Sequence, residues 1–147
     1  MTSAGVRLHA FSVALAALAL ATLLPWARSG SRSRNSYSLF AIAERLEVVT
    51  GTAATAARWW AVVPGATLAA VALLQLGYRR VGAAVGASVA VLSLLAVNAV
   101  AGSPLAGEIG LTSCAAAAVA VLILALVELV HAFRRHTPLP TPGVRHG

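Results

Sequence analysis

Four long apolar blocks divide this chain of 147 residues, and polar segments separate them. The blocks cover about residues 8–24, 59–77, 81–101 and 111–130. Each approaches the ~20 residues that an α-helix needs to cross the ~30 Å hydrocarbon core of a bilayer. None alternates polar and apolar residues as a barrel strand would, so the pattern predicts four membrane-spanning α-helices.

The first block admits two interpretations. Arg7 and His9, followed by the apolar residues 10–18, resemble the start of a secretory signal, with 19–21 as its cleavage site. Against this, the apolar run continues as far as Trp26, an interfacial tryptophan expected of a retained span. We predict a retained helix, and the signal-peptide interpretation stays open.

The segment between the first two blocks, residues 25–58, forms the first external loop of this topology. Its basic, serine-rich part, residues 28–36, is expected to be mobile by composition. Residues 37–49 instead carry apolar side chains at helical spacing, with Phe40 on the opposite face. The recurring positions are Leu39, Ile42, Ala43, Leu46 and Val49. This spacing predicts a short amphipathic helix on the outer membrane surface or capping the bundle.

Arginine placement predicts the orientation. Arg79 and Arg80 form almost the whole connection between the second and third blocks, and Arg7 and Arg134 fall on the same side of a four-span chain. Because arginines near membrane ends favour the cytoplasm, both termini are predicted there, in a multi-pass protein of the plasma membrane. Arginines of the first external loop oppose this orientation: Arg28, Arg32, Arg34, Arg45 and Arg58. They weigh less, because several lie far from a membrane end or beside acidic residues.

Composition and aromatic positions agree with four spans. The chain is 59% hydrophobic and only 10% charged, with a mean hydropathy of +0.85, which a water-soluble fold of this length could not house. Aromatic residues at the block ends are expected at the lipid headgroups: Trp26, Trp59, Trp60 and Tyr78. We therefore predict an all-α, polytopic four-helix transmembrane bundle over residues 1–136, and a disordered, proline-rich cytoplasmic tail over 137–147.

Small residues form a stripe along the third block. Gly82, Gly86 and Ala90 recur at four-residue steps, so they share one helix face. Inside lipid, such a face lets two helix backbones approach closely. The stripe is a candidate packing surface, either within one chain or against a partner protein or a second copy in a homo-oligomer, and both alternatives stay open.

Polar residues inside the blocks are the candidate functional positions. Gln75 and Glu128 fall near the inner ends of their helices, in the layer of Arg79 and Arg80. A carboxylate at membrane depth is costly unless it is paired, so we expect Glu128 to pair with one of these arginines or with Arg134. Titration of Glu128 during proton or ion movement is the functional alternative.

Asn98 is the candidate polar position near the outer end of the third block. It shares a layer with Thr67, Thr112 and Ser113 on the neighbouring blocks. An interhelical hydrogen bond is the expected explanation for an amide at this depth.

Residue types for catalysis are missing. The chain has no Asp and no Lys, which excludes Walker-type phosphate loops, lysine Schiff bases and aspartate-based metal or triad sites. The four histidines lie in the terminal regions without zinc-site spacing, and the single cysteine, Cys114, has no disulfide partner within the chain. The sequence therefore predicts no catalytic residue, no cofactor and no metal. The net charge of +7 lacks one basic face with stacking aromatics, so anionic lipid headgroups, not nucleic acid, are the expected partner.

Several stretches carry a family resemblance: residues 23–26, the Arg/Ser segment with residues 36–46, and Trp60 followed by the later spans. Here the chain resembles small, functionally uncharacterised four-helix membrane proteins of actinobacteria, a source that would suit its Ala- and Arg-rich, Lys-free composition. The resemblance implies no catalytic residues. We expect a non-catalytic accessory or scaffolding subunit of a cell-envelope complex. A small transporter or channel component and a membrane enzyme stay open as alternatives.

Overall fold

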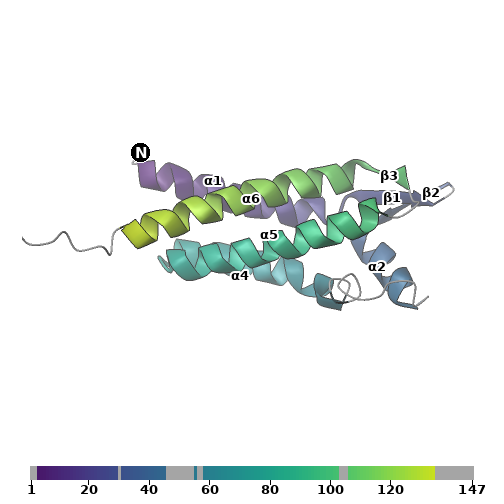
Figure 1. The fold of residues 1–147 in the computed structure, drawn as a ribbon, viewed down its shortest axis with the longest axis horizontal. Helices are drawn as coiled ribbons and strands as arrows, with labels where there is room; N and C mark the ends of the chain where they lie inside the picture. Colours follow the sequence, from purple (N-terminus) through teal and green to yellow (C-terminus); the bar gives the residue numbers. More distant parts are fainter. Residues whose placement is uncertain (1–2, 30, 46–54, 56–57, 103–105, 135–147) are drawn as a thin grey trace, which may run out of the picture.

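The computed structural model describes residues 3–29, 31–45, 55, 58–102 and 106–134, and the chain is mostly helical (Figure 1). The helices are α1 (Ser3–Ala21), α2 (Ser36–Arg45), the 3-10 helix η1 (Trp60–Val62), α4 (Val63–Gln75), α5 (Arg79–Ala101) and α6 (Ile109–Arg134). The predicted tail, 137–147, lies outside the described residues.

The four longest helices, α1, α4, α5 and α6, lie side by side and are called the helical body below (Figure 1). Both α1 and α5 contact α4 as well as α6, so each helix has two neighbours. By length and composition α5 and α6 could each cross a membrane, whereas Gly5–Ala21 and Trp60–Gln75 are shorter apolar helices. The apolar blocks thus became helices whose bounds differ from the predicted spans by a few residues.

Small residues allow the helices of this body to approach closely. A Cβ on Gly82 would lie 2.8 Å from Leu74 Cγ, and one on Gly86 would lie 3.1 Å from the Phe11 ring. Ala90, the third member of the stripe, is fully buried. The small-residue stripe of α5 therefore packs against α4 and α1 of the same chain, and larger side chains at these positions would force the helices apart.

A small antiparallel sheet covers one end of the helical body. Strands β1 (Pro25–Ser29), β2 (Arg32–Asn35) and β3 (Ala106–Gly107) are arranged in the order β2-β1-β3. Ala27 pairs with Arg34 on one side and with Gly107 on the other. The expectation that 28–36 is mobile is wrong for its strand residues, 28–29 and 32–35, and residue 30 lies outside the described part of the chain. Strand β3, from the turn before α6, supplies β1 with a pairing partner that local composition does not reveal.

Three aromatic rings pack beneath this sheet. Trp26 lies 5.1 Å from Trp60 and 6.2 Å from Phe40 between ring centroids, in edge-to-face arrangements that favour aromatic pairs. The expectation that Trp26 and Trp60 both lie at lipid headgroups is wrong, because their side chains are 0% and 1% exposed. Trp59 and Tyr78, in contrast, are 57% and 61% exposed.

The buried donors of this cluster are all bonded. Trp26 Nε1 donates to the Ala21 carbonyl at 2.9 Å, and Trp60 Nε1 donates to Ser36 Oγ at 2.8 Å. Ser36 Oγ in turn donates to the Thr22 carbonyl at 2.5 Å. These bonds connect the end of α1, the start of α2 and η1.

Helix α2 begins after Asn35, whose Oδ1 accepts a hydrogen bond from the Ser38 backbone N–H at 3.0 Å, as an N-cap does. The predicted surface helix covers 37–49, and its last residues, 46–49, lie outside the described part of the chain. Phe40 occupies the buried face of α2, opposite to its predicted side. The two tryptophans explain this, because they offer Phe40 an aromatic pocket that helical periodicity alone cannot show.

Candidate functional site

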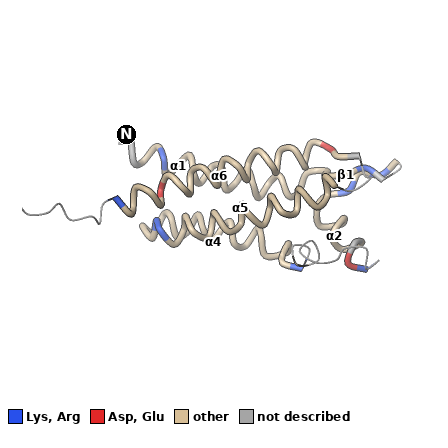
Figure 2. The backbone as a smooth tube through the Cα atoms, in the orientation of Figure 1, with Lys and Arg blue, Asp and Glu red and all other residues tan. Residues whose placement is uncertain are grey.

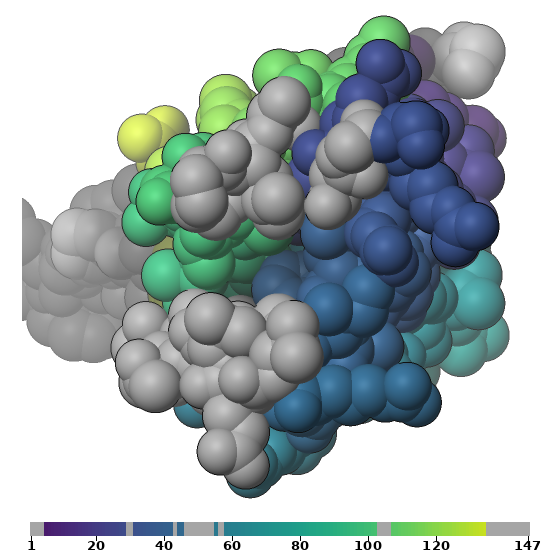
Figure 3. Space-filling model, turned by 90° about the vertical axis from the view of Figure 1, so that its right-hand side faces the viewer, coloured from purple at the N-terminus to yellow at the C-terminus, as the bar shows by residue number. Residues whose placement is uncertain are grey.

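Charged residues gather at the two ends of the molecule (Figure 2). No Arg, Lys, Asp or Glu occurs within residues 8–27, 59–78, 81–107 or 109–127. One end, called the sheet end below, holds β1, β2, β3, α2 and η1. Viewed onto the sheet end, β1, β2 and α2 lie beside the ends of α5 and α6 (Figure 3). The other, called the basic end, joins the start of α1, the α4–α5 turn and the end of α6.

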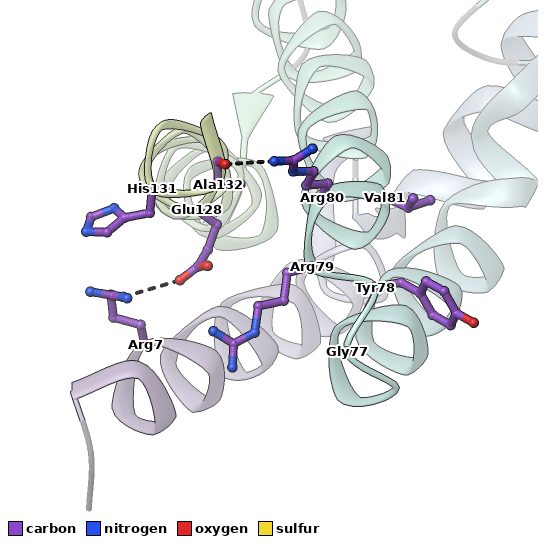
Figure 4. Close-up of a pocket in the computed structure, with 9 residues that line it drawn as sticks. All are labelled: Arg7, Gly77, Tyr78, Arg79, Arg80, Val81, Glu128, His131 and Ala132. Carbon is purple, nitrogen blue, oxygen red and sulfur yellow. Dashed lines mark hydrogen bonds and ion pairs between the residues drawn. The ribbon is translucent and has the colours of Figure 1, made fainter. Parts of the chain in front are cut away.

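A pocket of about 440 Å³ lies at the basic end (Figure 4). Its lining consists of Arg7, Gly77, Tyr78, Arg79, Arg80, Val81, Glu128, His131 and Ala132. Three arginines thus share one pocket with a single carboxylate. This concentration of cationic side chains makes the pocket the candidate functional site.

The α4–α5 turn places two of these arginines. Gly77 has φ +90°, in the left-handed region that favours glycine. The Gly77 N–H donates to the Leu74 carbonyl and the Tyr78 N–H to the Leu73 carbonyl, the pair of bonds of a Schellman motif. The chain therefore reverses within three residues, 76–78, so Arg79 and Arg80 occupy the first two positions of α5.

Glu128 forms its ion pair with Arg7. Arg7 Nε donates to Glu128 Oε1 at 3.3 Å, and the two side chains are 29% and 10% exposed. The expectation that Glu128 pairs with Arg79, Arg80 or Arg134 is wrong in the choice of arginine. Packing of α1 against α6 brings a residue 121 positions away into reach. The sequence does contain a feature that could have predicted Arg7 as the partner of Glu128. Arg7 lies just before the first apolar block, on the same side of the predicted bundle as the other arginines.

Arg80 fastens α5 to the end of α6. Its Nη2 donates to the Ala132 carbonyl at 2.7 Å, and its Cζ lies 5.8 Å from the centroid of the Phe133 ring. Carbonyls in the last turn of a helix lack partners within the helix, so this bond satisfies one of them. The Arg80 guanidinium is thus used mainly to hold the start of α5 against the end of α6.

Arg79 is different from its two neighbours in the pocket. Its side chain is half-buried and is directed toward α1 (Figure 4). Its guanidinium makes no hydrogen bond and no ion pair with any residue of the described ranges. The first turn of α5 also has no acidic residue and no side-chain cap. The first turn of α5 therefore carries two arginines at the positive end of the helix dipole and no acidic residue of its own.

The remaining candidate positions lie outside this pocket. Gln75 Nε2 donates to Ser12 Oγ at 3.2 Å, which joins α4 to α1 on an exposed face. Asn98 is exposed, and its side chain has no hydrogen bond within the segments that the structure describes. The expected interhelical hydrogen bond from Asn98 to Thr67, Thr112 or Ser113 is therefore not formed in these segments. Thr67 and Thr112 donate instead to carbonyls of their own helices.

The sheet end has an ion pair of its own, between Arg28 and Glu108. Arg28 Nε donates to Glu108 Oε1 at 2.8 Å, and Ser33 Oγ donates to the same oxygen at 3.0 Å. The Glu108 N–H donates to the Trp26 carbonyl at 2.9 Å. Sequence reasoning missed Glu108, because its partners lie at least 75 residues away and only the β1–β3 pairing brings them together.

The chemistry of the basic pocket is that of anion binding. It offers guanidinium groups and a helix N-terminus, whereas Cys114 is buried within α6 and is not part of the lining. No cluster of three or more His, Cys, Asp or Glu side chains able to hold a metal occurs among the residues that the structure describes. Comparison of the chain with protein-family models, with curated proteins and with solved structures finds no match.

Proposed function

We propose that this chain is a multi-pass membrane protein in which α1, α4, α5 and α6 all cross the bilayer. The observation that carries the proposal is an apolar belt around the helical body. Val13, Leu68, Leu95 and Leu126, one from each helix, are between 49% and 70% exposed. Soluble monomers rarely expose apolar patches larger than a few hundred Å², whereas lipid favours such a surface.

Helix lengths are compatible with this placement. At 1.5 Å per residue, the 26 residues of α6 span about 39 Å and can cross a ~30 Å core with tilt. The 16 residues of Trp60–Gln75 span only about 24 Å, so the bilayer must thin locally or flanking residues must extend the span. Trp59 and Tyr78, both exposed, flank this segment at the depth where amphipathic rings anchor a helix.

We further propose that the basic end faces the cytoplasm. Arg79 and Arg80 follow a three-residue connection, and short connections rich in arginine favour the cytoplasmic side. Arg7 and Arg134 add to this bias, because both lie next to a membrane end. Both termini then face the cytoplasm, and the sheet end faces outward.

Within the membrane, we assign the protein the role of a non-catalytic accessory or scaffolding subunit of an envelope complex. Thr67 and Ser93, two buried hydroxyls of the helical body, bond carbonyls of their own helices at 2.7 and 2.9 Å. No buried side-chain N or O atom in the described segments lacks a hydrogen-bond partner. Such a satisfied interior supports a structural role over a polar transport path. The ordered strands of the sheet end offer an outward surface for a partner.

Two measurements on native membranes test this proposal. After alkaline carbonate extraction, the chain should stay in the membrane pellet, and its release into the supernatant would contradict the spans. After solubilisation in mild detergent, at least one envelope protein should co-purify in a fixed ratio. Charge reversal on the exposed strand β2, Arg32→Glu, should weaken that association, whereas Arg134→Glu at the opposite end should leave it intact. A monomer without partners would overturn the accessory role.

A further inference from the structure

We infer that the pocket at the basic end binds the phosphate group of an anionic ligand, with Arg79 as its principal contact. Arg7 and Arg80 line the same pocket, and Glu128 is the internal competitor for Arg7. The inference goes beyond the proposed function, because a phosphate could bind these groups in any topology. If the phosphate belongs to a lipid headgroup, that part of the inference rests on the proposed membrane placement.

The proposal rests on a difference between the three arginines of the pocket, because only two of them have partners within the described part of the chain. Arg7 already holds Glu128 at 3.3 Å, and Arg80 holds the Ala132 carbonyl at 2.7 Å. Arg79 has neither kind of partner in the described part of the chain, although its side chain is half-buried. A half-buried cation without a counter-ion is only partly solvated, so an anion from outside the chain would stabilise it.

The start of α5 adds a second, independent reason. The backbone N–H groups of a helix N-terminus and the helix dipole attract anions. In α5 this end has no acidic residue in its first turn and no side-chain cap, and it carries two arginines instead. A ligand with negative charge would offset the dipole and both arginines at once.

The geometry of the pocket favours a phosphate ester over a small ion. A guanidinium presents a planar fork of donors that matches the oxygens of a phosphate. The volume of about 440 Å³ is far larger than a halide requires, so the pocket has room for an organic body beside the phosphate group. Phosphate esters combine a charged group with such a neighbouring body. Anionic phospholipid headgroups and soluble phosphate esters share this chemistry.

Glu128 sets how strongly the pocket attracts anions. Its carboxylate neutralises Arg7 and repels a phosphate from the same cavity. Glu128→Gln keeps the shape of the side chain but removes its charge, so it frees Arg7 for the ligand. This variant is therefore expected to gain affinity, an effect that loss of folding could not imitate.

The test uses the full chain in phosphatidylcholine nanodiscs, with two arms that distinguish the sources. In the first arm, glycerol 3-phosphate is titrated and the heat of binding is measured. In the second, phosphatidylglycerol is added to the nanodiscs, and native mass spectrometry records the lipids that stay bound. Saturable binding in the first arm alone identifies a soluble ester, and saturable lipid retention identifies a headgroup.

The variants decide whether the binding belongs to this pocket. Arg79→Ala should weaken it roughly tenfold or more, since a hydrogen bond to a charged group contributes about 1.5–3 kcal/mol. Arg134→Ala removes a charge from the same end outside the pocket and should leave the affinity unchanged, and Glu128→Gln should raise it. Carbonate extraction of each variant separates a lost site from lost membrane insertion. The inference is overturned if neither arm shows saturable binding, or if Arg79→Ala and Arg134→Ala weaken binding equally.

Discussion

The two ends of the molecule differ in how fully their buried polar side chains are hydrogen-bonded within the chain. At the sheet end, Trp26, Trp60 and Ser36 donate to defined acceptors, and Glu108 receives both Arg28 and Ser33. At the basic end, three arginines share a pocket with one carboxylate, and Arg79 has no partner among the described residues. The sheet end is therefore joined by buried hydrogen bonds between its elements, whereas the pocket of the basic end contains a half-buried guanidinium without a partner, which we propose binds an anion.

The largest expected effect lies in the aromatic cluster of the sheet end. Trp60→Ala removes a side chain that is 1% exposed and packs against Trp26 and Phe40, so it should lower the free energy of unfolding by about 3–5 kcal/mol. Denaturation in detergent, followed by circular dichroism, measures this loss. Trp59→Ala is the matched control, because that ring is 57% exposed and its removal should cost no more than about 0.5 kcal/mol. Equal losses for the two variants would refute the cluster as the stabilising element.

A smaller effect is expected where α6 meets β1. A Cβ on Gly110 would press on the Pro25 carbonyl and lie 2.7 Å from Trp26 Cδ1, so Gly110→Ala should cost about 1–3 kcal/mol through overpacking. Gly65→Ala on α4 meets open space and should stabilise the helix, by up to about 1 kcal/mol. Thermal unfolding of both variants in the same detergent compares them. An unchanged stability of the Gly110→Ala variant would mean that α6 does not pack closely against β1.

The smallest effects should differ in sign between the two ends. Arg28→Ala breaks the contact with Glu108 at the sheet end and should cost no more than about 1 kcal/mol, because the Arg28 side chain is largely exposed. Arg79→Ala removes an unpaired cation from a helix N-terminus and should stabilise the ligand-free chain by about 0.3–1 kcal/mol. Melting temperatures at low ionic strength give both values. If both variants lowered the melting temperature, the predicted difference between the paired Arg28 and the unpaired Arg79 would be wrong.

Helices were predictable because their signal is local. The apolar runs at 81–101 and 111–130 lie within α5 (Arg79–Ala101) and α6 (Ile109–Arg134), since a run of apolar residues long enough to cross a membrane has few other solutions. The grouping of Arg79, Arg80 and Glu128 at one end followed in the same way from antiparallel helices. The bounds of α1 were predicted less closely, since Ser3–Ala21 both begins and ends earlier than the apolar block 8–24.

The sheet and the ion pairs were not predictable from local pattern. Residues 28–36 look polar and mobile in isolation, yet 28–29 and 32–35 lie in strands β1 and β2. Strand β3 and Glu108, from the turn before α6, supply partners to β1 that the local sequence does not reveal. Trp26 and Trp60 likewise looked like interfacial anchors, since nothing near them in sequence predicts that they contact each other. The pairing of Arg7 with Glu128 depends on which helices are neighbours, and hydropathy does not specify that.

Membrane placement, on which the proposed function depends, is tested most directly by labelling three single-cysteine variants in a Cys114→Ala background. Ser31→Cys lies at the sheet end, Tyr78→Cys at the basic end, and Leu68→Cys in the middle of the belt, where Leu68 is 70% exposed. In intact cells a membrane-impermeant maleimide should label only Ser31→Cys, and permeabilisation should add Tyr78→Cys. Leu68→Cys should stay unlabelled until the chain is denatured. Rapid labelling of native Leu68→Cys would mean that water, not lipid, covers the apolar belt, and would contradict the account.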